Sequence, residues 1–426
     1  MKGLRRTRAA CLAIGLIACA KDPPPGVGVD GGGGADGTGV NPGMRATPFG
    51  SHSFAYPAGV IFPSGTPAGR DEAVTRLYDR WKAAYVADGC GGRYVRTNGG
   101  TGAKDAITVS EGHGYGMIIT ALMAGHDPEA QSTFDGFVRV LRQFPSQINR
   151  DLMSWAVGAN CQPIAGPNSA SDGDLDVAFA LLLANRQWGS RGAIDYFVEA
   201  NRVIGAIARS VMNTETNLPL LGDWATSGAF YYAARPSDFM ADHFRAFAPV
   251  RSRALFTAAV DRIYTTVDRL QTGPGRTTGL VPDFVIGTNS DLRPAPADFL
   301  EAPTDGDYSY NSCRVPWRLG TDYVVSGDPR ARQALDRLTT FAKGKSGGDP
   351  ARIAPGYRLD GTPLSMASAN GAFVGPFAVA AMIDASHQAW LDALWAWMVE
   401  KDLQDYYADS IRLLSMIVVS GNWWAP

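Results

Sequence analysis

Two acidic segments of the chain contain carboxyl groups that could do acid–base chemistry. Glu111 lies in the segment SEGHGYGM (110–117), in which glycine occupies three alternate positions. Asp172, Asp174 and Asp176 follow in the segment SDGDLD, directly before an apolar run. A protonated carboxyl group can donate a proton to a leaving oxygen, and an ionised one can take a proton from water. We therefore take these two segments as candidates for a general acid and base pair.

The segment around Glu111 allows a structural interpretation as well. Thr108 and Glu111 have the Thr-x-x-Glu spacing of a capping box, in which the glutamate bonds back to the start of its helix. Three glycines, however, weaken a helix by roughly 1 kcal/mol each. Glycine suits the close approach of a ligand or of another backbone. Both interpretations stay open at this point.

The aspartate cluster also has alternatives. Carboxylates at a helix N-terminus are favoured by the helix dipole, and Ser171 could cap this helix. A calcium loop that begins D-x-D-x-D is excluded, because Val177 replaces the glycine of its sixth position and Leu183 the glutamate of its twelfth. Three acids within five residues repel one another, which indicates that at least one has a further role.

Aromatic side chains are frequent in the segments between the expected helices. Such rings can stack on the apolar faces of sugars, and next to acidic residues they favour a saccharide-binding cleft. The residues concerned are Trp155, Trp224, Phe230, Tyr231, Tyr232, Tyr308, Tyr310, Trp423 and Trp424.

Helical periodicity dominates from about residue 50 onward. Apolar residues recur at i, i+3, i+4 and i+7 in twelve segments, and period-two alternation is rare. The segments are 71–88, 110–124, 133–144, 172–188, 192–212, 237–247, 253–270, 310–325, 329–342, 365–385, 387–397 and 404–419. No internal repeat supports a solenoid. We therefore predict an all-α fold, a closed toroid of helical hairpins that forms a single domain.

The first residues have the composition of a bacterial lipoprotein signal. A basic start and a short apolar run (9–18) end at Cys19, and the run is too short to span a bilayer, which takes about 20 residues. We expect a signal peptide (1–18), a lipidated Cys19 with a Gly/Pro-rich flexible linker (19–48) and a catalytic domain (49–426). The protein would be exported and anchored to the outer membrane or cell surface by its lipid. An ordinary secretory signal, cut elsewhere, is the alternative.

Charge and cysteine content exclude other classes of protein. Removal of residues 1–18, with their four basic and no acidic side chains, lowers the formal charge from −2 to −6. An acidic chain without a basic cluster argues against nucleic acid as a partner. We expect Cys90 and Cys161 to form a disulfide in the oxidising envelope, with Cys313 left over. No Cys/His spacing indicates a metal site, so we expect no metal and no cofactor. We also expect a monomer.

Three long motifs, in order, carry a resemblance to a known family. The segments SEGHGYGM (110–117), SASDGDLDVA (169–178) and YSYNSCRVPWR (308–318), followed by DSIRLL (409–414) and GNWW (421–424), resemble the hallmarks of glycoside hydrolase family 8. The resemblance implies an (α/α)6 barrel. It also implies an enzyme that hydrolyses β-1,4 linkages of cellulose, mixed-linkage glucan, xylan or chitosan with inversion.

The resemblance assigns roles to individual residues. Glu111 matches the general acid of the family, and Asp172 matches the carboxylate at the distorted sugar ring of the cleavage subsite. Arg314 matches an arginine near the same subsite. We expect further substrate contacts from Trp155, Trp224, Arg235, Tyr308, Tyr310, Asn311 and Asp174.

One position departs from the commonest family pattern. Asn311 stands where most members have the catalytic aspartate base, and an amide cannot take a proton from water. Another branch of the family, with chitosanases and lichenan-cleaving enzymes, has asparagine there and draws its base from a glutamate of a preceding loop. We therefore predict Glu301 as the base, with Asp298 and Asp305 as rivals.

The same departure motivates a function of a different class. A surface glycan-binding lipoprotein that has lost catalysis would also tolerate Asn311. A polysaccharide lyase on a similar toroid is a further alternative. For the hydrolase, the Asn311 branch leaves chitosan, lichenan and cellulose open as substrates and makes xylan a weaker expectation.

Overall fold

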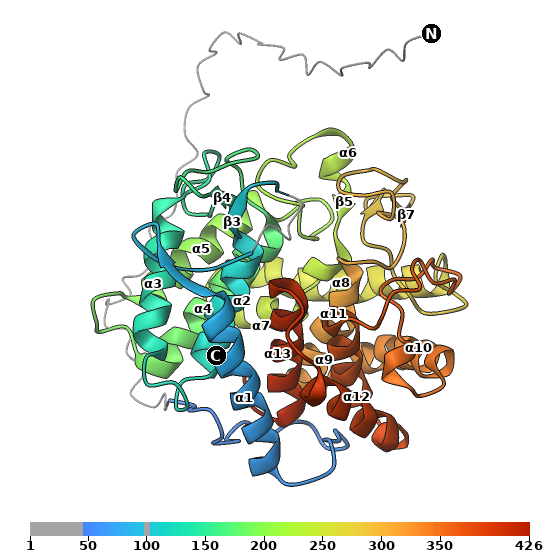
Figure 1. Ribbon diagram of the computed structural model, residues 1–426. Helices are drawn as coiled ribbons and strands as arrows, with labels where there is room; N and C mark the ends of the chain where they lie inside the picture. Colours follow the sequence, from blue (N-terminus) through green and yellow to red (C-terminus); the bar gives the residue numbers. More distant parts are fainter. Residues whose placement is uncertain (1–45, 98–102) are drawn as a thin grey trace, which may run out of the picture. The chain divides into compact units, whose positions relative to one another are not determined.

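Six helices form an inner ring in the computed structural model, which describes residues 46–97 and 103–426. Each inner helix contacts the next, and the last packs against the first, so that the ring closes (Figure 1). The inner helices are α2 (Ser110–Leu122), α4 (Ser171–Trp188), α7 (Ala241–Phe247), α9 (Val315–Ser326), α11 (Gly371–Ala381) and α13 (Tyr406–Ser420).

Six further helices form an outer ring around the first. Each outer helix packs against an inner helix that is its neighbour in sequence, except that α1 packs against α13. The outer helices are α1 (Pro67–Tyr85), α3 (Ala130–Gln143), α5 (Tyr196–Ser210), α8 (Arg253–Thr272), α10 (Pro329–Ser346) and α12 (Gln388–Glu400). The architecture is an (α/α)6 barrel, and the predicted all-α toroid is confirmed.

The two rings differ in sequence because they differ in environment. The inner helix α11 has the sequence GAFVGPFAVAA, and all its residues are buried. The outer helix α3 buries Phe134, Phe137 and Leu141 on one face and carries polar residues on the other. A helix that is apolar on all sides belongs inside a fold, whereas an amphipathic one covers it. The sequences of these two helices therefore agree with their positions in the inner and the outer ring.

Charged side chains inside the barrel are paired with one another. Arg318 donates to both carboxylate oxygens of Asp176, at 2.8 and 2.6 Å. His243 lies between Asp176 and Asp242, at 2.9 and 3.0 Å. Because buried charges are stable only when paired, Asp176 has a structural role, and it is one of the three acids whose repulsion indicated a further role for the cluster.

Two glycines allow α2 and α4 to cross closely, Gly114 of the segment 110–117 and Gly173 at the start of α4. A Cβ on Gly114 would lie 2.6 Å from Cβ of Asp176, and one on Gly173 would lie 2.5 Å from the backbone carbon of Ser110. Real Cβ atoms do not approach other atoms so closely. A Cβ on Gly112 or Gly116 would instead meet a side chain, that of Tyr406 at 3.2 Å or of Val95 at 2.5 Å. Gly114 thus serves the approach of another backbone, one of the two uses expected from the sequence, and the crossing brings Glu111 next to Asp172.

Short strands and loops gather at one end of the barrel (upper part of Figure 1). β1 (Val86–Gly89) pairs with β2 (Gly92–Val95), and β3 (Ala106–Val109) pairs with β4 (Ala156–Gly158), both antiparallel. β5 (Ala233–Ala234), β6 (Val285–Ile286) and β7 (Arg293–Pro294) form a three-stranded antiparallel sheet. The short helix α6 (Gly228–Tyr231) lies in the same region.

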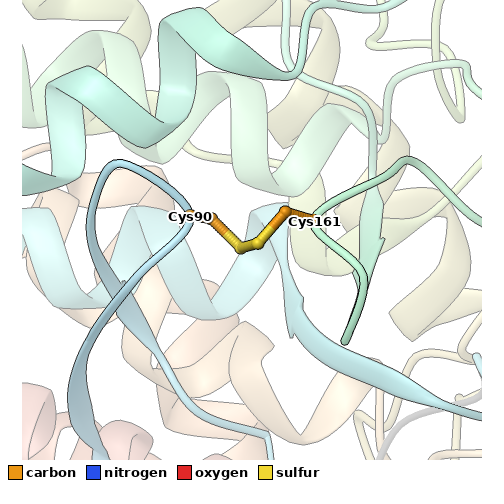
Figure 2. Close-up of a disulfide and its surroundings, with 2 residues drawn as sticks. All are labelled: Cys90 and Cys161. Atoms are coloured by element: carbon orange, nitrogen blue, oxygen red, sulfur yellow. A yellow bond between two sulfur atoms is a disulfide. The ribbon is translucent and has the colours of Figure 1, made fainter.

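The expected disulfide joins two of these loops. Cys90, in the turn between β1 and β2, is bonded to Cys161, which follows β4, as Figure 2 shows. Cys313 is free and buried, and burial raises the pKa of its thiol to about 12. The thiol is therefore protonated and unreactive at neutral pH.

Several predicted helix boundaries were wrong. The segment 71–88 begins earlier, at Pro67, and ends at Tyr85, because the residues that follow pair in the β1–β2 hairpin. The segment 365–385 forms a helix only over Gly371–Ala381, where Asn370 caps the first turn through Ala372. Tertiary pairing and capping override helical periodicity at these ends.

The predicted signal peptide (1–18) and the lipidated Cys19 lie outside the described residues, as does most of the linker (19–48). Among residues 46–97 and 103–426, no helix is both long and apolar enough to cross a membrane.

Replacement of Gly173 by alanine should destabilise the barrel. The added Cβ would meet backbone of α2, which cannot move aside, so we expect a loss of about 1–3 kcal/mol, typical of overpacking. Thermal unfolding followed by circular dichroism measures the effect. The matched control is Gly344→Ala in α10, where a Cβ meets nothing within 4 Å and should be neutral or slightly stabilising. Equal melting temperatures for Gly173→Ala and the wild type would contradict this account of the helix crossing.

Candidate active site

A cleft of about 780 Å³ opens at the end of the barrel where the loops gather. Its walls come from the start of α2, from the segments 155–172 and 221–235, from the loop 300–311 and from the start of α13. Glu111, Asp172 and Glu301 all line it. The structure thus brings together three carboxyl groups that lie up to 190 positions apart in the sequence.

Glu111 lies in the first turn of α2 and points to the cleft. Its Oε2 accepts a hydrogen bond from Nη1 of Arg314 at 2.6 Å, and its Oε1 accepts one from the hydroxyl of Tyr406 at 3.3 Å. The capping-box interpretation is wrong, because α2 begins at Ser110 after Val109 and has no side-chain cap. Burial, together with the charge of Asp172, raises the pKa of Glu111 to about 7 although Arg314 acts in the opposite direction.

Asp172 lies in the first turn of α4 and is ionised. Its Oδ2 accepts from Nη1 of Arg235 at 2.8 Å and from Nη1 of Arg314 at 3.1 Å. Burial acts to raise the pKa of Asp172, but the two arginines outweigh it and lower this pKa to about 2. Ser171 does not cap the helix, because its hydroxyl donates to the carbonyl of Leu220.

Arg314 is the centre of the hydrogen-bond network and is completely buried. Besides Glu111 and Asp172, its Nη1 reaches the hydroxyl of Tyr115 at 3.1 Å. Its Nη2 donates to Oγ of Ser237 at 2.9 Å and to Oδ1 of Asn311 at 2.7 Å. The guanidinium therefore connects side chains from α2, α4 and the loop before α9.

Glu301 reaches the cleft from the loop that precedes Asn311. Its Oε1 accepts from Nη2 of Arg235 at 3.1 Å, and its Oε2 accepts from Nδ2 of Asn311 at 2.8 Å. The side chain is 44% exposed, so water can reach it. A continuous chain of contacts thus runs from Glu111 through Arg314, Asp172 and Arg235 to Glu301.

The charges along this chain are unequal in number. Two arginines face three carboxyl groups, and only Asp172 contacts both arginines. Asp238, behind Arg235 at 3.9 Å, does not add a full negative charge, because burial raises its pKa to about 7. Glu111 is largely buried and contacts only one of the two arginines, so it keeps its proton better than Asp172, which contacts both.

The two rival bases do not lie in the cleft lining. Asp298 is exposed, with a left-handed φ of 56°. Asp305 is 1% exposed, and its carboxylate accepts hydrogen bonds from the backbone amides of Leu300, Glu301 and Ala302. A carboxylate committed to three amides inside the protein cannot take a proton from water in the cleft, so the geometry favours Glu301.

Among the other expected substrate contacts, Trp155, Trp224, Arg235, Tyr310 and Asn311 line the cleft. Tyr310 is half-exposed there, and its ring packs edge-on against Phe373. Arg314 lies beneath the cleft, in contact with side chains that line it.

Two expected contacts lie elsewhere. Tyr308 is completely buried and pairs through its backbone with Tyr357, so it belongs to the core. Asp174 is buried behind the cleft wall, where it accepts from the amide of Met153, and burial raises its pKa strongly. Neither side chain reaches the cleft lining. Asp174 follows Asp172 by two residues in α4, which is about 200° around a helix, so its side chain faces away from the cleft.

Other aromatic residues of the expected set are structural. Trp423 is buried and stacks on Phe179, and Trp424 is 2% exposed. Phe230 packs against Trp224 and Phe299, so it supports the cleft wall from outside. The sequence contains no signal that separates these rings from those that line the cleft.

Residues at the start of α13 complete the cleft and were not predicted. Asp405, Tyr406 and Tyr407 line it, and Tyr406 contacts Glu111 directly. Their segment was predicted only as part of a helix. The Asp-Tyr-Tyr sequence at a helix start, where Asp405 caps the amide of Ala408, was the available signal. In the described ranges, no group of three potential metal ligands occurs.

Comparison with known proteins identifies the family. The sequence profile of the glycosyl hydrolases family 8 matches residues 67–421. A β-glucanase of Niallia circulans is 43% identical over 379 residues, which cover 88% of this chain and 91% of that protein. An endoglucanase of Bacillus sp. (strain KSM-330) is 38% identical, over 84% of this chain and 77% of that protein.

A solved structure gives the same result. A β-1,3-1,4-glucanase from Paenibacillus sp. X4, 42% identical, superposes with a TM-score of 0.86 over 90% of this chain and 100% of that one. The inner-ring helices thus carry the motifs SEGHGYGM and SASDGDLDVA in a fold that matches a solved glucanase. This chain belongs to glycosyl hydrolase family 8.

Proposed function

We propose that this protein is an endo-acting glycosidase that hydrolyses β-1,4 bonds of a β-glucan with inversion at the anomeric carbon. The observation that carries the proposal is the contact chain between Glu111 and Glu301 through Arg314, Asp172 and Arg235. It holds one protonated and one solvent-accessible carboxyl group in the same cleft. The names of the related proteins, β-glucanase and endoglucanase, support the same class of substrate.

Glu111 is the general acid in this proposal. A group with a pKa of about 7 is largely protonated in neutral and mildly acidic solution, and it can give its proton to the departing glycosidic oxygen. The hydroxyl of Tyr406 and the guanidinium of Arg314 hold its carboxyl group in place. After proton transfer, Arg314 stabilises the carboxylate that forms.

Glu301 is the general base. Inversion takes two carboxyl groups about 6.5–9.5 Å apart, so that a water molecule fits between one of them and the sugar. Glu301 makes no direct hydrogen bond to Glu111 and is linked to it through Arg314, either by way of Asp172 and Arg235 or by way of Asn311. Asn311 and Arg235 each bind one of its oxygens and leave a lone pair on each oxygen for water. Asn311 thus orients the base that it cannot itself supply.

Asp172 holds the sugar ring at the cleavage point. Its low pKa keeps it charged throughout the working range, and a fixed negative charge beside the anomeric carbon stabilises an oxocarbenium-like transition state.

The charges of the cleft favour a neutral glycan over chitosan. Four carboxyl groups line it, and three of them belong to the contact chain. The fourth, Asp405, caps α13. Each carboxyl group of the contact chain thus already faces an arginine, and Arg235 would repel the ammonium groups of chitosan. We propose mixed-linkage β-glucan (lichenan) as the preferred substrate and cellulose as the second.

Release of reducing ends by the purified protein tests the proposal. We expect the fastest release from lichenan, slower release from carboxymethyl-cellulose, and little from chitosan or xylan. A rapid fall in viscosity relative to reducing-end release would show internal cleavage. Fastest cleavage of chitosan would contradict the substrate argument. A folded protein inactive on all four would contradict the proposed activity.

The Glu111→Gln and Glu301→Gln variants should each lose about 10²- to 10⁴-fold in kcat, the range of general acid–base catalysis. With an aryl glycoside that has a good leaving group, kcat should be restored in Glu111→Gln but not in Glu301→Gln, because such a leaving group departs without a proton. Wild-type activity should fall as the pH rises through about 7, where Glu111 loses its proton, and Glu111→Gln should lack this limb.

The opposite result in the base variants would be decisive. If Glu301→Gln keeps a near wild-type rate while Asp298→Asn loses it, the base is assigned to the wrong residue.

We also propose that the enzyme is an exported monomer, anchored to the outer membrane or cell surface by a lipid on Cys19. The support is the basic start, the short apolar run and the Ile-Ala-Cys sequence at 17–19. A tethered hydrolase would act on a polymer that is too large to enter the cell.

Metabolic labelling with a radioactive fatty acid checks the anchor. We expect label in the wild type and its loss in Cys19→Ala, together with release of the protein from the membrane fraction. Cys313→Ser is the control, because that thiol is buried in the barrel and should leave labelling unchanged. Equal labelling of wild type and Cys19→Ala would contradict the proposal.

A further inference from the structure

We propose that Asp305 is a positioning residue that sets the place of the catalytic base through the backbone of its loop. The inference rests on the proposed function, in which Glu301 is that base. Asp305 does not line the cleft, and it acts through the amide groups of the residues that carry and flank Glu301.

Both carboxylate oxygens of Asp305 accept hydrogen bonds from backbone amides of the loop that carries Glu301. Its Oδ2 accepts from the amides of Leu300 at 2.7 Å and of Glu301 at 3.0 Å, and its Oδ1 accepts from the amide of Ala302 at 2.9 Å. Three amides converge on one side chain that is 1% exposed. An ionised carboxylate is acceptor-only, so it can satisfy all three, whereas an asparagine would turn its own donor toward one of them.

Asp305 also fixes the loop to the neighbouring sheet. Its own amide donates to the carbonyl of Ala302, and its carbonyl accepts from the amide of Phe284, just before β6. Asp283, the residue before Phe284, accepts through its Oδ1 from the amides of Ser309 and Ser312 at 2.9 and 2.7 Å. The loop of Glu301 and the segment that contains Asn311 are therefore held from adjacent positions, Phe284 and Asp283, of the segment just before β6.

The side chain of Glu301 needs this support. It is 44% exposed and contacts Arg235 and Asn311 at the tips of its carboxylate, so the position of its backbone sets where this carboxylate meets water. A displacement of about 1 Å at a catalytic group can cost about 10²-fold in rate. Removal of the Asp305 carboxylate should cause such a displacement.

The loop should stay folded without this carboxylate. Phe299, beside Glu301, packs against Phe230 and Phe284 with ring centroids 5.2 and 6.3 Å apart. These rings belong to a small apolar cluster separate from the core of the barrel. Loss of the amide contacts therefore loosens the position of Glu301 rather than the fold.

Azide rescue of Asp305→Ala tests the inference. Azide attacks the anomeric carbon of a β-glycoside from the side of the water and does so without a base. The N–C1 bond forms while the C1–O bond breaks, Glu111 gives its proton to the leaving oxygen, and the product is an α-glycosyl azide. The substrate is a β-glucan oligosaccharide, and the measurements are kcat, KM and the yield of glycosyl azide.

We expect Asp305→Ala to lose about 10²-fold in kcat with KM changed less than threefold, and azide to restore at least tenfold. Asp305→Asn keeps one acceptor oxygen, so its kcat should lie between that of Asp305→Ala and that of the wild type. Asp298→Asn is the matched control, because it is an exposed acid of the same loop and should match the wild type. Asp223→Ala removes a carboxylate that is also 1% exposed but accepts from the amides of Ser169 and Asn149, away from the loop of Glu301, and azide should not restore its activity.

The outcomes separate this inference from the base assignment. If azide does not restore Glu301→Gln, the assignment of the base fails. If azide restores Glu301→Gln while Asp305→Ala either keeps wild-type kcat or loses activity without rescue, the role of Asp305 alone is overturned. Circular dichroism establishes that each variant is folded, and Asp305→Asn supplies the same test if Asp305→Ala does not fold.

Discussion

The sharing of one buried guanidinium between two carboxyl groups determines the chemistry of this protein. Arg314 contacts both Glu111 and Asp172, but a single positive charge cannot fully stabilise two negative ones in a buried site. Asp172 also contacts Arg235 and stays ionised, and Glu111 keeps a proton. Different roles for two nearby carboxyl groups thus follow from the number and position of the arginines.

The arrangement depends on the close crossing of the helices that carry these carboxyl groups. Ser110 and Gly173 meet where α2 and α4 begin, at a distance that excludes any side chain on residue 173. Both helices also contribute to the apolar wall of the inner ring. The barrel is therefore more than a support for loops, because its packing sets the distance between Glu111 and Asp172, which the proposed mechanism uses.

Buried carboxylates hold the loops that complete the cleft in place through hydrogen bonds from backbone amides. Asp223 accepts from the amide of Ser169 on one wall, and Asp305 holds the loop of the base on another. Asp409 accepts from the amide of Gln404 beneath the third. Loops have few regular backbone hydrogen bonds, so a buried acceptor satisfies several amides at once and gives the loop one conformation.

The sequence by itself determined the helical toroid through its periodicity, and its motifs, through their family resemblance, determined that Glu111 and Asp172 belong to the site. Helical periodicity and compact motifs are local features of the sequence, so they can be recognised without knowledge of tertiary contacts. Only the tertiary structure placed Glu301 in the cleft and Asp305 beneath its loop, brought Tyr406 to Glu111 and buried Tyr308 in the core. These outcomes depend on the direction of a side chain and on contacts between residues up to about 300 positions apart, which no local pattern encodes.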